Sequence, residues 1–334
     1  MLRIHFTDAD LASVRVASKP DPLWEVASTL YRFQSRRGLG AFADWHRAAR
    51  EDLHRQGLAA AVRGLLMPLF PRGSYFPDFL TPAEADEGLD AGLDAIMSAS
   101  GERVRAELST LDRVAGVPAD AARLVGTDGR RELVDMIRAY HATAVAPYGE
   151  RMQAHVDADR SLRARALLEG GVDGLLTGFQ PWMHWRRPIL EVDYLADDRD
   201  LHLAGRGLLL VPSYFSWGGP VSLADPTLPP VLTYSLHHTT PDPVGRDARA
   251  AKAPLAALLG TTRAAILQAV ATGATNGELA RAVSVSAANV SHHTAVLRDS
   301  GLIASRRHAN SVLHTLTPAG AALLRTSAKR QRTS

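Results

Sequence analysis

The hydrophobic residues in the first half of the chain recur mainly at helical spacing. Three runs have apolar side chains every three or four positions: Leu89, Leu93, Ile96 and Met97; Val104, Leu108 and Leu111; and Leu133, Ile137 and Tyr140. This repeat gathers the apolar side chains on one face of a helix, which then packs against a core. The pattern predicts a first domain that is mostly helical.

Towards residue 240 the hydrophobic pattern changes from helical spacing to alternation. The segment ILEVDYL at 189–195 alternates in period two, and PPVLTYSL at 229–236 is a further candidate strand. Between them, LHLAGRGLLLVPSYF at 201–215 has two apolar runs separated by Gly205, Arg206 and Gly207. Two such runs around a glycine-rich turn are typical of a hairpin. We therefore expect a small antiparallel sheet to end this domain.

The segment HHTTPDPVGRDARAAKAP, residues 237–254, has no apolar periodicity and is rich in Pro, Thr, Asp and Arg. Such composition marks a linker or a domain border. A chain of 334 residues is long enough for two domains. We assign residues 1–240 to a helical domain, 241–254 to a linker and 255–334 to a second domain.

After the linker, helical spacing returns in Leu255, Leu258 and Leu259 and again in Ile266, Leu267 and Val270. TNGELARAVS at 275–284 then predicts a short helix. Ser286 is a good N-cap for the next helix, and Gly301 suits its end because glycine readily adopts the left-handed conformation. The pattern indicates two helices that meet at a tight turn.

The helix that starts after Ser286 has an apolar side and a small polar side. Val290, Thr294 and Leu297 fall at i, i+4 and i+7 and should face the core. The opposite side fits a major groove about 12 Å wide, where Asn, Ser and His can bond base edges.

Two short strands about residues 308–310, in LIASRRHANSVLHTL, predict a wing, and Thr317-Pro318 suits the start of a last helix. The predicted fold class is thus mainly α with small β elements: a helical first domain and a C-terminal winged helix-turn-helix. Arg306 and Arg307 near the wing tip are suited to phosphate or a minor groove. The expected DNA contacts are Ser286, Ala288, Asn289, Ser291, His292, Ala295, Arg298, Arg306, Arg307 and Asn310.

The distribution of charge supports a polyanionic partner. Residues 246–334 carry a net charge of +9 and residues 1–245 a net charge of −6. A basic module on an otherwise acidic chain is typical of DNA binding, because neutralising phosphates releases condensed counterions. The excess of Arg over Lys throughout the chain is not evidence for DNA binding, because it also reflects the base composition of the coding sequence.

Residues 258–270, 276–307 and the wing resemble the winged helix-turn-helix of the ArsR family of repressors, in LLGTTRAAILQAV and NGELARAVSVSAANVSHHTAVLRDSGLIASRR. The resemblance implies a homodimer on a near-palindromic operator in double-stranded DNA, read by the helix that begins after Ser286. Thr294 and Ala295 depart from the leucine and the basic residue that the family often has there. A weaker resemblance, in LRIHFTDADLASVRVA, DPLWEV and GLLLVPSYF, is to the first domain of long ArsR-like regulators.

Metal and cofactor chemistry is not expected. The chain has no cysteine, so thiolate metal sites, disulfides and thiol redox sensing are excluded. The family's zinc-sensing pattern of His and Asp is missing from the last helix. We find no GxSxG, HExxH, phosphate-binding P-loop or strand-linked GxGxxG, so we expect no catalytic function.

An aromatic segment of the first domain is the candidate effector site. Trp182 and Trp185 precede Arg186 and Arg187, and Trp217 follows 32 residues after Trp185. Ligand pockets are mostly apolar and aromatic with a few polar groups. We expect a small apolar or aromatic effector near Trp182, Trp185, Arg186 and Trp217; the alternative is that these residues only pack a core.

These observations predict a one-component transcription regulator, a repressor whose DNA affinity is modulated through its first domain. Two alternatives remain open: an enzyme delivered to DNA by its winged helix, and a regulator whose first domain binds a partner protein. No membrane-length apolar stretch and no secretory leader are visible. We therefore expect a cytoplasmic protein without a membrane partner.

Overall fold

The computed structural model describes residues 1–35, 41–71, 75–194 and 198–236, and residues 255–324 apart from 257, 271–272, 284, 309–310, 318 and 321–322. The chain forms two compact units, Met1–Leu236 and His237–Ser334. Each unit has its own cluster of buried apolar side chains.

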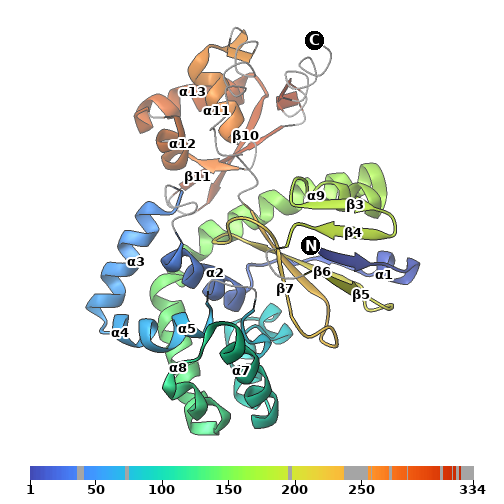
Figure 1. The fold of residues 1–334 in the computed structure, drawn as a ribbon. Coiled ribbons are helices and arrows are strands. Elements are labelled where there is room, and N and C mark those ends of the chain that lie inside the picture. The colour runs from blue at the N-terminus through green and yellow to red at the C-terminus, as the bar shows by residue number, and fades with distance from the viewer. Residues whose placement is uncertain are drawn as a thin grey trace. The chain divides into compact units, whose positions relative to one another are not determined.

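The larger unit is mostly helical, which confirms the predicted fold class. Its helices are α1 (Asp8–Ala12), α2 (Pro22–Gln34), α3 (Ala43–Arg55), α4 (Ala59–Ala61), α5 (Met67–Leu69), α6 (Leu89–Ser98), α7 (Gly101–Ala115), α8 (Thr127–Ala144) and α9 (Gly149–Thr177). The three predicted helical runs fall in α6, α7 and α8. In Figure 1 the helices α3, α5, α7 and α8 lie at one end of this unit and the strands at the other.

The strands of the larger unit form two four-stranded sheets. They are β1 (Leu2–His5), β2 (Val14–Val16), β3 (Met183–Arg186), β4 (Ile189–Val192), β5 (Arg199–His202), β6 (Leu208–Ser213), β7 (Val221–Ser222) and β8 (Val231–Ser235). The order is β3-β4-β1-β5 in one sheet and β2-β6-β8-β7 in the other. Both sheets are mixed, because β1 pairs in parallel with β5, and β6 pairs in parallel with β2 and β8.

The hairpin predicted around residues 205–207 was wrong, and so was the purely antiparallel sheet. The two apolar runs enter different sheets, because β5 pairs with β1 and β6 with β2. Gly207, at φ +71°, passes so close to the segment before β2 that an added Cβ would lie 2.5 Å from the Ser13 carbonyl oxygen. The buried Asp10 carboxylate holds this crossing by accepting the Gly207 N–H at 2.9 Å. The glycines therefore serve a crossing between sheets instead of a tight hairpin.

The smaller unit has the predicted helix-turn-helix and wing. Its elements are α11 (Thr261–Ala269), β9 (Ala274–Thr275), α12 (Asn276–Val283), α13 (Ala287–Asp299), β10 (Ile303–His308) and β11 (Ser311–Leu316). The strands form an antiparallel sheet in the order β10-β11-β9. As predicted, Ser286 caps α13 by accepting the Asn289 N–H, and Gly301 follows the helix at φ +69°. Thr317 likewise accepts the Gly320 N–H at 3.1 Å, as an N-cap does.

A buried carboxylate in the larger unit joins α2 to the loop after β6. Glu25 is fully buried, and its two oxygens accept the N–H groups of Tyr214 at 2.6 Å and Phe215 at 3.0 Å. The Ser213 hydroxyl also donates to it, at 3.1 Å. Burial raises the pKa of Glu25 to about 7, although these three donors favour the charged form and oppose the shift. Burial raises the pKa of Asp21 to about 7 as well.

We expect the larger unit to lose stability as the pH rises from 5 to 8. A carboxyl whose pKa is higher in the folded chain binds its proton more tightly when folded, so the stability present at low pH is lost through pH 7. For Glu25 the loss is up to about 3 kcal/mol, since one pKa unit corresponds to about 1.4 kcal/mol. Urea unfolding followed by tryptophan emission measures it, because all five tryptophans lie in this unit.

Glu25→Gln should make that pH dependence smaller, because the amide does not titrate. It should also lower the free energy of unfolding at every pH, since its NH₂ faces a backbone N–H. Glu102→Gln, at an exposed position near the start of α7, is the matched control and should leave the pH profile as it is. A profile unchanged by Glu25→Gln would contradict the assignment.

Candidate nucleic-acid interface

The orientation of α13 is set by its apolar side. Val290, Thr294 and Leu297 are at most 4% exposed and lie in the core of the smaller unit, as predicted. The Thr294 hydroxyl donates to the Val290 carbonyl at 2.9 Å. Its polar atom is therefore satisfied within the helix, which explains how threonine occupies a core position.

The opposite side of α13 is open to solvent. Of the predicted contacts, Ser286, Ala288, Asn289, Ser291, His292 and Arg298 are exposed and Ala295 is partly buried. The exposed side chains at positions 288, 289, 291 and 292 are small or planar, and none carries a fixed charge. This surface has the shape and the donor and acceptor groups that a major groove accepts. That these residues contact DNA stays a prediction.

The wing presents two basic side chains in different directions. Arg306 and Arg307 are both exposed on β10, and they pair with Leu313 and Val312 of β11. Successive side chains of a strand point to opposite faces. The two arginine side chains therefore leave the ribbon on opposite faces. Asn310, also predicted as a contact, lies outside the described residues.

A buried histidine connects the wing to the exposed side of α13. His314 on β11 is 4% exposed, and its Nδ1 lies 2.8 Å from the Ser305 hydroxyl. Its Nε2 lies 2.9 Å from Asn276 Oδ1, and Asn276 Nδ2 donates to the Ser291 hydroxyl at 3.2 Å. Burial, with a smaller effect of Arg298, lowers the pKa of His314 and favours the neutral ring. The sequence pattern singled out neither Asn276 nor His314, because no spacing rule relates residues 276, 305 and 314.

The candidate effector residues have different neighbours in the larger unit. Trp185 donates its indole N–H to Asp173 at 2.6 Å and packs edge-on against Phe6. Arg186 pairs with Glu191 at 3.4 Å. Trp217 follows β6 and lies edge-on to Phe42, with ring centroids 6.1 Å apart. Trp182, just before β3, is partly buried. These contacts place Trp185 and Trp217 in separate aromatic groups, so an effector site that joins them stays a prediction.

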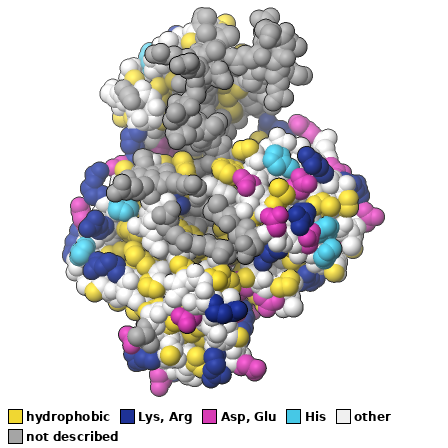
Figure 2. Space-filling view, viewed as in Figure 1, with side chains coloured by type: hydrophobic (Ala, Val, Ile, Leu, Met, Phe, Trp, Pro, Cys, Tyr) yellow, Lys and Arg dark blue, Asp and Glu magenta, His cyan; other side chains and the backbone are white. Residues whose placement is uncertain are grey.

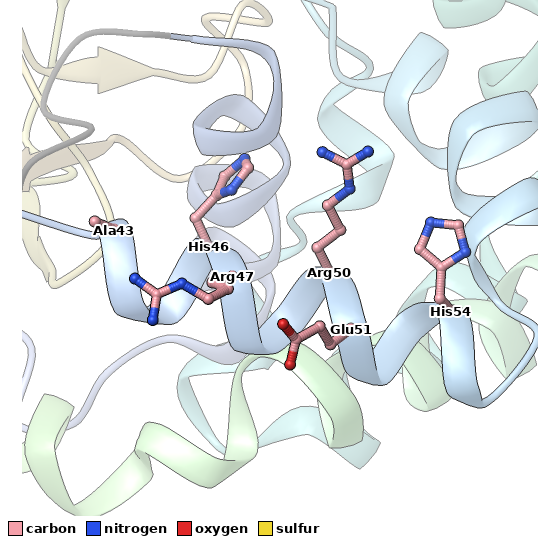
Figure 3. Close-up of a pocket in the computed structure, with 6 residues that line it drawn as sticks. All are labelled: Ala43, His46, Arg47, Arg50, Glu51 and His54. Atoms are coloured by element: carbon pink, nitrogen blue, oxygen red, sulfur yellow. The ribbon is translucent and has the colours of Figure 1, made fainter.

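A hollow of about 590 Å³ runs along α3 and was not predicted. It is lined by one exposed side of that helix, as Figure 3 shows: Ala43, His46, Arg47, Arg50, Glu51 and His54. Partial burial, with a smaller effect of Arg50, lowers the pKa of His46. Residues of a single helix line this hollow, so it presents an open basic surface instead of an enclosed pocket.

The smaller unit thus has the geometry of a winged helix-turn-helix. A family model described as a helix-turn-helix domain matches residues 261–306, from the start of α11 into β10. No curated protein matches the chain, and no solved structure does. The match supports the helix-turn-helix part of the resemblance, whereas nothing identifies the larger unit.

Two absences concern only the part of the chain that the structure describes. No group of three or more His, Asp or Glu side chains there is arranged to hold a metal ion. Among the helices of the same residues, none is long and apolar enough to cross a bilayer.

We expect Asn289→Ala or His292→Ala to cost about 1 to 3 kcal/mol on the duplex that the chain binds best. Both side chains are exposed on α13, and removing a base contact leaves random DNA nearly unaffected. Anisotropy titrations on both duplexes measure this difference, with Ser300→Ala, exposed just after α13, as the control. An equal loss on both duplexes would show that this side of α13 does not read bases.

Arg306→Ala and Arg307→Ala should weaken binding to all sequences alike. The variant that removes a phosphate contact should reduce the slope of log K against log salt by about one. Because the two side chains lie on opposite faces of the ribbon, we expect unequal effects. Arg165→Ala, which removes an exposed arginine of α9 in the larger unit, controls for net charge. If both wing variants had the same slope of log K against log salt as Arg165→Ala, neither arginine would contact a phosphate.

Proposed function

We propose that the protein is a DNA-binding transcription regulator that represses from a near-palindromic operator as a homodimer. The observation that carries the proposal is the side of α13 opposite its buried stripe, which is exposed, small and polar within a matched helix-turn-helix domain. Such a surface has little to bury against protein and many groups to offer base edges.

The charge of the chain favours the same partner. Residues 246–334 carry +9, whereas the remainder carries −6. On the face of the larger unit shown in Figure 2, basic and acidic side chains are interspersed instead of gathering by sign. The non-specific part of DNA affinity is therefore expected to come from the C-terminal part of the chain.

The size of the reading element supports the proposed dimer. One α13 offers only a few side chains to the groove, enough for one half-site. Helix-turn-helix dimers place two recognition helices in successive major grooves about 34 to 36 Å apart, so a two-fold protein reads a near-palindrome. We assign to the larger unit the control of this state, through an effector or through dimer contacts.

We assign the buried carboxylates of the larger unit a structural role instead of a catalytic one. Glu25 accepts two backbone N–H groups, and Asp78 accepts those of Ala224 and Asp225 at 2.7 to 3.0 Å. Burial raises the pKa of Asp78 to about 6. In each case the carboxylate binds the chain itself and holds a loop, which accounts for its burial without a substrate.

The full-length chain should select a near-palindromic duplex from a random-sequence library, with half-sites one helical turn apart. Light scattering should show two chains per duplex. The affinity should fall by several log units per log unit of salt, if about 6 to 10 phosphates are contacted. Failure to enrich any sequence, or a salt slope near zero, would overturn the proposal; a single half-site bound by one chain would overturn the dimer.

A further inference from the structure

The strand pairing of the smaller unit brings four polar side chains into one line. Ser305 and His314 are directly opposite each other in the β10–β11 ladder. His314 pairs with Ala274 of β9, and β9 is followed at once by Asn276, the first residue of α12. Asn276 in turn meets Ser291 on α13. The line runs from the wing, through the buried base of the domain, to an exposed position on α13.

The hydrogen-bonding capacity of each group sets the direction of the bonds. The amide oxygen of Asn276 only accepts, so the His314 nitrogen facing it, Nε2, must carry the proton. In a neutral ring Nδ1 is then an acceptor, and the Ser305 hydroxyl donates to it. At the other end the NH₂ of Asn276 donates to the Ser291 oxygen. Ser291 thus accepts from the protein and keeps its own proton for a partner outside.

The hydrogen-bond direction described above requires a neutral His314 ring. The ring is 4% exposed, and a second ring proton would face the Ser305 hydroxyl, which then has to turn and accept. Burial lowers the pKa of His314, with Arg298 contributing in the same direction. The bonds therefore have one stable direction near neutral pH.

We propose that Asn276 and His314 are positioning residues that fix the Ser291 hydroxyl as a hydrogen-bond donor towards DNA. The inference rests on the proposed DNA binding and names what this position recognises. A donor suits the major-groove acceptors guanine N7 and O6, adenine N7 and thymine O4, and phosphate oxygens. It does not suit the amino groups of cytosine and adenine, which are donors themselves. Because its inward bond uses a lone pair, Ser291 keeps its proton available for an acceptor at its contact, whereas a serine that donates inward has no proton to offer.

Asn276→Asp tests the direction by reversing it. A carboxylate accepts from both neighbours, so Ser291 has to donate inward and turns only lone pairs towards DNA. On the duplex selected by the wild-type full-length chain, Ser291→Ala should cost about tenfold, equivalent to 1.4 kcal/mol. Asn276→Asp should cost at least as much. In a chain that already carries Ser291→Ala, Asn276→Asp should reduce the affinity only by the effect of its added negative charge.

Gly277→Asp supplies the size of that charge effect. It places a carboxylate one residue further along α12, where an added Cβ has nothing within 4 Å. A loss of affinity with Asn276→Asp that exceeds the loss with Gly277→Asp measures coupling between residues 276 and 291, provided that the excess disappears when Ser291 is replaced by Ala. Equal costs of Asn276→Asp with and without Ser291 would overturn the inference, while the proposed DNA binding would stand. A wild-type chain that selects no duplex would overturn both.

The tautomer of His314 provides a second test, which does not depend on the folding of the Asn276→Asp variant. Histidine-selective ¹⁵N spectra of the full-length chain distinguish an imidazole protonated at Nε2 from one protonated at Nδ1, and His314→Gln assigns the signal. We expect the Nε2–H tautomer at pH 7. An Nδ1–H tautomer would mean that Asn276 donates to the ring and accepts from Ser291, which would overturn the inference.

Discussion

The burial of one side of α13 determines what the smaller unit presents to a partner. Val290 and Leu297 are at most 1% exposed and share a core with Ile266 and Leu279. Rotating the helix by one residue, about 100°, would bring Val290 to the surface and bury a polar neighbour. Burying an aliphatic side chain is worth about 1.5 to 3 kcal/mol, and an unpaired buried polar group costs a similar amount. The outward residues are therefore oriented before any DNA is present.

Polar contacts between residues far apart in the chain determine the arrangement of loops and strands that the burial of apolar side chains does not determine. In the larger unit the carboxylates of Asp10, Glu25 and Asp78 each accept backbone N–H groups from residues at least 146 positions later in the chain. His314 has a similar place in the smaller unit, where it ties β10 to α12. Because a buried unpaired group is costly, each of these contacts selects one arrangement of a loop or strand.

The sequence was sufficient to predict features that depend on local periodicity. The helices around Leu93, Leu111 and Ile137, the cap at Ser286 and the two sides of α13 follow from spacing of three and four residues and from cap chemistry. The pairing of β5 with β1 did not follow, because alternation shows which face of a strand is buried and not which strand lies beside it. The contacts of Asn276 and His314 were missed for the same reason: they depend on the register of β9, β10 and β11.

In the proposed function, DNA affinity and sequence specificity arise from different groups. The positive charge of the C-terminal part acts on any phosphate backbone, whereas the side of α13 that faces outward offers neutral hydrogen-bonding groups at fixed angles. The two meet on β10, where Ser305 begins the polar line and Arg306 follows it directly. On the proposed function, a phosphate contact that displaced β10 would change the distance between Ser305 and His314, and with it the support of Ser291. The wing would then affect which sequence the proposed regulator reads as well as how tightly it holds DNA.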